Sequence, residues 1–177
     1  MLTSSGRVPL RLAMAEHPGN DHVDGAWWPQ SRTLAVELVD LVDHFPAPYG
    51  RIVRAFVSRA DWDAAPGYVD AAAGAVRVGP SPRRDSHLVH LETAERSVLH
   101  VLVVPPGFTD AQGAESMLAA ATAGNRHSAA DILEAVTEYP DVDPSDRWTD
   151  HGGSWWDPDP LAPSFRPGTG QGQGQDT

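Results

Sequence analysis

The stretch that most constrains the fold is Val-Asp-Gly-Ala-Trp-Trp-Pro at residues 23–29, which holds two of the six tryptophans just ahead of an amphipathic segment. Successive side chains of an extended chain point to opposite sides. Trp27 and Trp28 therefore cannot both enter one apolar core from a regular strand. We expect one ring to pack inward and the other to line a groove or the surface.

Composition excludes several classes of function. The net charge of -11 opposes binding to nucleic acid or to an anionic membrane, since both require a basic surface. Cysteine and lysine are both absent. Disulfides, thiol nucleophiles, thiolate zinc sites and Schiff-base lysine chemistry are therefore excluded. The longest uncharged apolar run, residues 97–108, is too short to cross a bilayer, and residues 1–16 have no signal-peptide apolar segment. We expect a cytoplasmic protein.

Apolar spacing predicts a single α+β domain over residues 1–139. Strands are predicted at residues 8–14, 51–58, 68–69, 75–78, 87–92 and 97–104. We expect a mainly antiparallel sheet of about five strands with helices packed on one face.

Three helices are predicted from their spacing and their capping residues. The first covers residues 32–44 after Ser31 as N-cap, the second opens with the capping-box pair Thr109 and Gln112, and the third follows Ser128. The inner faces are expected at Leu34, Leu38, Leu41 and Phe45, then at Ala111, Ala114, Met117, Leu118 and Ala121, and finally at Ala129, Ile132, Leu133 and Val136. A solvated face of the first helix is expected at Glu37, Asp40 and His44.

Asp85-x-His87-x-x-His90 is the cluster that most resembles a set of metal ligands. On a regular strand Asp85 and His87 share one face while His90 points to the other. His100 lies on the facing strand and joins either face, depending on the register of the hairpin. A core histidine is therefore favoured over a metal site, and no cofactor and no tightly bound metal are expected.

Other catalytic patterns are weaker. Asp61 and Asp63 flank Trp62 and suit either acid–base work or turn capping, and turn capping is favoured. The chain has neither a Gly-x-Ser-x-Gly elbow nor a Gly-x-Gly-x-x-Gly loop.

Residues 140–177 differ in composition from the rest of the chain. They are rich in Asp, Pro, Gly and Gln, and seven aspartates against two arginines give a net charge of about -5. Such a segment buries too little apolar surface to fold, so a disordered tail is expected. Its Trp155–Trp156 pair echoes the box, and it either docks on the domain or binds a partner.

The order of several motifs resembles a known family. The box is followed by Trp62, by Asp85-x-His87, by Leu-Val-Val-Pro-Pro at residues 102–106, and by an alanine-rich stretch at residues 119–125. In this order the chain is similar, over about residues 8–138, to an uncharacterised actinobacterial domain-of-unknown-function family numbered 5994. The resemblance implies one compact domain, a GC-rich bacterial source and a cytoplasmic setting. It supplies no activity, ligand or catalytic residue, and the tail lies outside it.

The residues favour a non-enzymatic binding or regulatory module that binds an unknown small molecule or protein. The alternative is a small metal-dependent hydrolase that uses Asp85, His87 and His90. For the binding module, the candidate ligand-binding residues are Asp24, Trp27, Trp28, Trp62, Asp85 and His87.

The composition of the tail leads to a prediction. Deletion of residues 141–177 should leave the melting temperature within a few degrees of that of the full chain, because the segment has no aliphatic periodicity. Thermal unfolding of both proteins measures the effect. An aggregated or unfolded product would mean that the tail completes the core.

Overall fold

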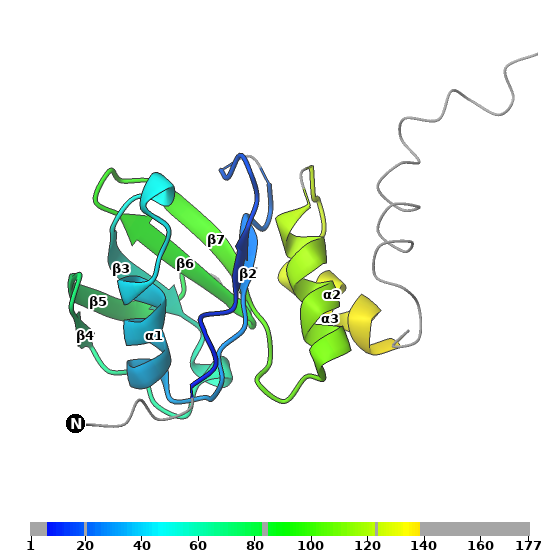
Figure 1. Cartoon of the computed structure of the whole chain (residues 1–177), viewed down its shortest axis with the longest axis horizontal. Helices are drawn as coiled ribbons and strands as arrows, with labels where there is room; N and C mark the ends of the chain where they lie inside the picture. Colours follow the sequence, from blue (N-terminus) through cyan, green and yellow to red (C-terminus); the bar gives the residue numbers. More distant parts are fainter. Residues whose placement is uncertain (1–6, 20, 83–84, 123, 139–177) are drawn as a thin grey trace, which may run out of the picture.

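The computed structural model describes residues 7–19, 21–82, 85–122 and 124–138. The predicted tail, with Trp155 and Trp156, lies outside the described residues. Within the described part, seven strands form one mixed sheet in the order β1-β2-β7-β6-β3-β5-β4 (Figure 1). The strands are β1 Leu12–Met14, β2 Gly25–Trp27, β3 Ile52–Val57, β4 Tyr68–Ala71, β5 Gly74–Pro80, β6 Leu88–Thr93 and β7 Val98–Val103.

The strand that the sequence did not predict is β2, which runs through the tryptophan box. It pairs antiparallel with β1 on one side and parallel with β7 on the other. A second parallel pair joins β3 to β5, and the remaining neighbours are antiparallel. The expectation of about five mainly antiparallel strands is therefore only partly met. Three residues are too few for strand periodicity to be visible, so β2 depends on its partners.

Helices cover both faces of the sheet, and the expectation of helices on one face is wrong. Helix α1, Leu34–Asp43, packs on one face, and α2, Asp110–Ala121, and α3, Ala129–Glu138, pack on the other at the end formed by β2 and β7 (Figure 1). The cause lies in β7, because Val101 and Leu102 are both fully buried and point to opposite faces. A strand that is apolar on both faces requires a layer on each.

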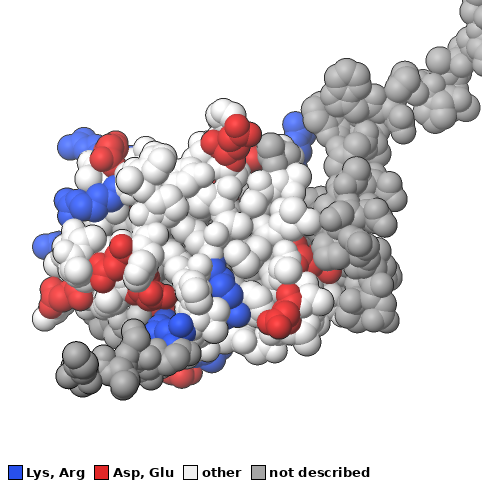
Figure 2. Space-filling model, viewed as in Figure 1, with Lys and Arg blue, Asp and Glu red and all other residues white. Residues whose placement is uncertain are grey.

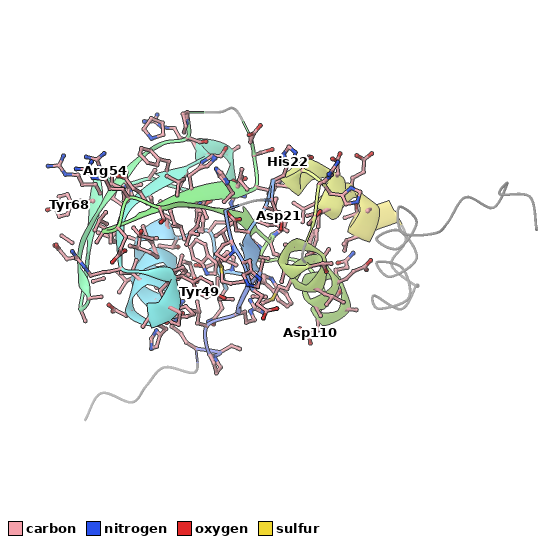
Figure 3. All side chains as sticks on the ribbon, turned by 90° about the horizontal axis from the view of Figure 1, so that it is seen from above. Asp21, His22, Tyr49, Arg54, Tyr68 and Asp110 are labelled. Atoms are coloured by element: carbon pink, nitrogen blue, oxygen red, sulfur yellow. The ribbon has the colours of Figure 1, made fainter. Side chains whose placement is uncertain are left out.

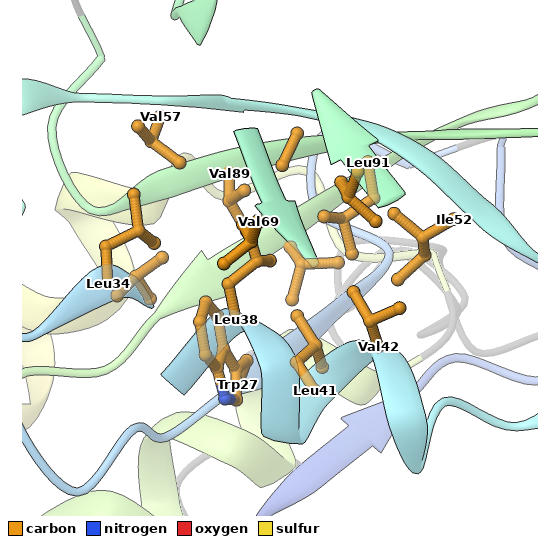
Figure 4. Close-up of a cluster of buried hydrophobic side chains, with 14 of the residues drawn as sticks. Trp27, Leu34, Leu38, Leu41, Val42, Ile52, Val57, Val69, Val89 and Leu91 are labelled. Atoms are coloured by element: carbon orange, nitrogen blue, oxygen red, sulfur yellow. The ribbon is translucent and has the colours of Figure 1, made fainter. Parts of the chain in front are cut away.

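Each face has its own apolar core. The core beneath α1 is shown in Figure 4 and contains Trp27, Leu34, Leu38, Leu41, Val42, Ile52, Val57, Val69, Val89 and Leu91, among others. The core beneath α2 and α3 contains Val23, Ala26, Trp28, Leu88, Leu102, Val104, Ala119, Ala120, Ala129, Ile132 and Leu133.

The first helix differs from its prediction at its start. It begins at Leu34, and Ser31 is not its N-cap. The side chain of Ser31 instead donates to Glu37, which is buried and also accepts from the Gln30 amide and from Arg7. The prediction that Glu37 is solvated is therefore wrong. Its carboxylate is buried because it accepts hydrogen bonds from the segment that precedes the helix and from Arg7. The buried positions Leu34, Leu38 and Leu41 are confirmed.

The second helix has the predicted capping box between Thr109 and Gln112, but its predicted inner face is wrong. The buried positions are Gly113, Glu115, Ser116, Ala119 and Ala120, whereas Leu118 is 43% exposed. Gly113 lies directly over the ring of Trp28, so a side chain of any size there would collide with it. The large ring of Trp28, directly after β2, therefore sets the rotation of α2, and the helix sequence does not reveal it. The predicted inner face of α3 is confirmed.

The two tryptophans of the box point to opposite faces, as alternation requires. Trp27 lies in the core beneath α1 with its ring 5.4 Å from that of Trp62, and Trp28 lies in the core beneath α2. They are 1% and 6% exposed, so the prediction of one exposed ring is wrong. Even the outer part of Trp28 is covered, since the Arg11 guanidinium lies 3.6 Å from its ring centre. In the described part of the chain no helix is long and apolar enough to cross a membrane.

The close approach of α2 to Trp28 leads to a prediction. Gly113→Ala should lower the free energy of unfolding by about 1–3 kcal/mol, because the added methyl overlaps the ring and forces the helix outward. Gly107→Ala is the matched control, since nothing lies within 4 Å of a Cβ atom at that position. Urea unfolding of both variants provides the measurement. Equal stabilities for the two variants would contradict the packing.

The burial of both rings leads to a second prediction. Trp27→Ala and Trp28→Ala should each cost about 3–5 kcal/mol of unfolding free energy, because each ring fills a separate core. Chemical denaturation compares the two losses. A small loss at only one position would mean that the ring there is exposed in solution.

Candidate functional site

A pocket of about 300 Å³ opens on the face of the sheet that carries α2 and α3. Its walls come from the loop before β2, the loop before β6, the paired strands β6 and β7, and the first turn of α3. Figure 3 shows Asp21 and His22 beside α3 at one side of this region. The lining residues are Asp21, His22, Asp85, Ser86, Leu88, His90, His100, Ser128, Ala129 and Ala130.

Two histidines on neighbouring strands form the floor of the pocket. His90 on β6 lies directly opposite His100 on β7, so the hairpin register brings both imidazoles to one face. Their rings meet edge to face with centres 4.9 Å apart. His90 is buried with Nδ1 3.4 Å from Ser81 Oγ, whereas His100 is partly exposed with Nδ1 3.7 Å from Asp24 Oδ2. The register left open by the sequence is thereby settled.

Asp24 lies behind this floor rather than in the pocket. Its side chain is fully buried, and its carboxylate accepts the Gly19 amide at 2.6 Å and the His100 amide at 2.8 Å. A buried carboxylate is stable only with such partners. Asp24 therefore fixes the loop before β2 against β7 and holds the backbone of His100 in place.

The first turn of α3 forms the opposite wall. Ser128 and Asp131 cap this helix reciprocally, because the Asp131 amide donates to Ser128 Oγ and the Ser128 amide donates to the Asp131 carboxylate. These hydrogen bonds from Ser128 hold the pKa of Asp131 below its usual range. The capping fixes the position of Ala129 and Ala130 at the pocket edge. Across the opening, Asp21 accepts the Gly124 amide at 3.3 Å.

His87 does not face the pocket but turns toward Asp61. The Asp61 carboxylate is buried and accepts the His87 amide at 2.7 Å, and its other oxygen lies 3.4 Å from His87 Nδ1. Burial raises the pKa of Asp61, while the charges of His87 and Arg32 and the amide bond offset part of that rise. Asp61 therefore holds a distant residue instead of capping its own turn as predicted, and Asp63 pairs with Arg32 at 3.1 Å.

The structure separates the residues of the proposed metal cluster. Asp85 and His90 line the pocket, but His87, which has a backbone φ of 61°, is directed to Asp61. Within the described ranges, no group of three or more His, Asp or Glu side chains is placed to hold a metal ion. The hydrolase alternative therefore loses its proposed set of ligands.

The candidate residues from the sequence divide into two groups. Asp85 lines the pocket and Asp24 supports it from behind, whereas the rings of Trp27, Trp28 and Trp62 are buried in the cores. Sequence reasoning missed the contributions of Asp21, His22, Ser86, Leu88, Ala129 and Ala130. These residues come from segments that are far apart in the chain and carry no shared motif. For Ser128 the sequence predicts only a role as a helix cap.

Comparison with known proteins identifies a family and no activity. No curated protein and no solved structure matches the chain. A family model described as a family of unknown function, DUF5994, matches residues 10–121, from the segment before β1 to the end of α2. Helix α3, with its wall of the pocket, follows the matched region. The resemblance to this family is confirmed, and the chain belongs to the DUF5994 family.

Proposed function

We propose that this protein is a non-enzymatic binding module whose pocket between the β6–β7 hairpin and α3 holds a small polar molecule. The observation that carries the proposal is the convergence of polar side chains from four separate segments on one cavity of about 300 Å³. That volume lies at the lower end of the range of small-molecule sites. This pocket takes the place of the tryptophan-lined groove as the candidate binding site, because the tryptophan rings are buried in the cores.

The lining favours a ligand that carries an amino group. Asp21 and Asp85 supply carboxylate acceptors, and no arginine is among the described lining residues. The imidazoles of His22, His90 and His100 can each donate or accept a hydrogen bond. Leu88 and Ala129 add a small apolar surface. A compact molecule with an amino group and further hydrogen-bonding groups would match these partners.

The geometry supports binding rather than nucleophilic catalysis. Ser81 Oγ lies 3.4 Å from His90 Nδ1, which is longer than the roughly 2.6–3.2 Å expected between a serine nucleophile and its base. The Asp61–His87 pair has an orienting carboxylate, but neither residue lines the pocket. No described pair therefore combines an activated nucleophile with a place for a substrate.

The charge of the molecule supports the expected choice of partner. Acidic and basic groups are interspersed on the face seen in Figure 2 and are separated by uncharged surface. With a net charge of -11, the protein offers no broad basic surface on that face for nucleic acid or an anionic membrane.

We infer that the protein is actinobacterial and cytoplasmic. We also propose that the Trp155–Trp156 pair docks on the domain or on a protein partner.

Thermal-shift screening tests the proposed pocket. The probes are a panel of amines, amino acids, nucleosides and carboxylic acids, and amino compounds are expected to raise the melting temperature. A compound at about 100 times its Kd should stabilise the fold by about 2.7 kcal/mol, equivalent to several degrees.

Two variants make the screen specific to the pocket. Ala130→Trp places a large ring at the pocket edge and should abolish the shift. Ala111→Trp is the matched control, because both alanines are exposed and are the second residue of their helices. A shift that survives in Ala130→Trp, or a panel with no hit, would contradict the proposal.

A further inference from the structure

We propose that Asp61 and His87 form a proton-operated latch that sets the position of Asp85 and Ser86 in the wall of the pocket. This regulation rests on the proposed binding function of the pocket. The latch itself is a property of the backbone at His87, so it can be tested without a ligand.

His87 is held in a conformation that its own sequence does not favour. Its φ of 61° lies in the left-handed region, which is disfavoured for a residue with a Cβ atom. Two hydrogen bonds hold it there from opposite sides. Its amide donates to Asp61 Oδ2 at 2.7 Å, and its carbonyl accepts the amide of Val103, the last residue of β7, at 2.8 Å.

The support for Asp61 is firmer than that for His87. Asp61 ends a short 3-10 turn, Arg59–Asp61, whose Ala60 carbonyl accepts from Arg32 at 2.8 Å. Arg32 is in turn paired with Asp63 at 3.1 Å. Asp61 Oδ1 is buried, has no hydrogen-bond partner and lies 3.4 Å from His87 Nδ1. When the latch is released, the residue expected to move is therefore His87.

In the chain, His87 connects two segments that line the pocket, although its own side chain does not line it. Asp85 and Ser86, which line the pocket, directly precede it, and Leu88 and His90 in β6 follow it. The β6 side is fixed by pairing with β3 and β7. A change at the His87 backbone is therefore passed to Asp85 and Ser86 rather than to the strand.

The charge on Asp61 decides whether the latch holds. When the Asp61 carboxylate is ionised, it accepts a strong hydrogen bond from the His87 amide and attracts the His87 imidazole. Both interactions weaken when the carboxylate is protonated. The described charged groups that act on Asp61 are His87 and Arg32. Burial outweighs them and raises the pKa of Asp61, so its proton binds above the ordinary carboxyl range of about 4.

Protonation of Asp61 at low pH does not destabilise the folded domain. Because the pKa of Asp61 is raised in the folded state, protonation favours the fold. The stability that this group contributes is present at low pH and is lost as the pH rises through the folded pKa. Acid therefore releases the latch without unfolding the domain through this group.

Amide NMR spectroscopy of the full chain between pH 7.5 and 4 tests the latch. The amides of Asp85, Ser86 and His87 should share a transition with a midpoint above the ordinary carboxyl range. On its acid side the His87 amide should lose protection against hydrogen exchange, measured relative to the intrinsic exchange rate at the same pH. Asp61→Asn should remove the shared transition at all three amides. Asp63→Asn is the matched control and should retain it, because Asp63 bonds to Arg32 and not to His87.

A second substitution distinguishes the carboxylate from the imidazole as the titrating group. His87→Asn keeps a residue that tolerates left-handed backbone and keeps the amide donor. The transition should persist at the amide of residue 87 in this variant. A transition that survives Asp61→Asn, or that His87→Asn removes entirely, would overturn the proposal. These spectra need no ligand, so a failed thermal-shift screen would leave the result on the latch standing.

Discussion

The fold depends on the pairing of β2 with β7, two strands that are buried on both faces. Alternating side chains of β7 enter the core beneath α1 and the core beneath α2 and α3. Trp27 at the end of β2 and Trp28 directly after it do the same. Removal of water from both sides of this pair stabilises the fold through apolar burial on two faces at once. The positions of the two helical layers are fixed relative to each other because both layers pack on these strands.

The local elements could be predicted because their signals are local. The β4–β5 and β6–β7 hairpins, the capping box of α2 and the inner face of α3 depend on residues within a few positions of each other. The features that sequence reasoning missed depend on distant partners. Residues 25–27 form a strand because β1 and β7 lie on either side. Glu37 is buried because Arg7 and Gln30 reach it from another segment.

The candidate site shows the same division. Asp85, a candidate ligand-binding residue from the sequence, lines the pocket, whereas its apparent partner His87 is directed to Asp61, because a left-handed residue breaks the alternation of a regular strand. A single sequence gives only a weak signal for a non-glycine position with positive φ, although histidine is enriched at such positions. The wall supplied by α3 could not be predicted either, since α3 lies beside β6 and β7 only in the folded packing of the core beneath α2 and α3.

The long reach of the β2–β7 pair also affects how the chain acquires its structure. The bond between the Asp24 carboxylate and the His100 amide closes a loop of 76 residues. During synthesis, β1 and the tryptophan box leave the ribosome well before their partner strand exists. The early chain therefore carries two large exposed rings until β7 and, for Trp28, α2 have been made. Pairing over such distances slows folding and prolongs the period in which exposed apolar groups can associate with other chains.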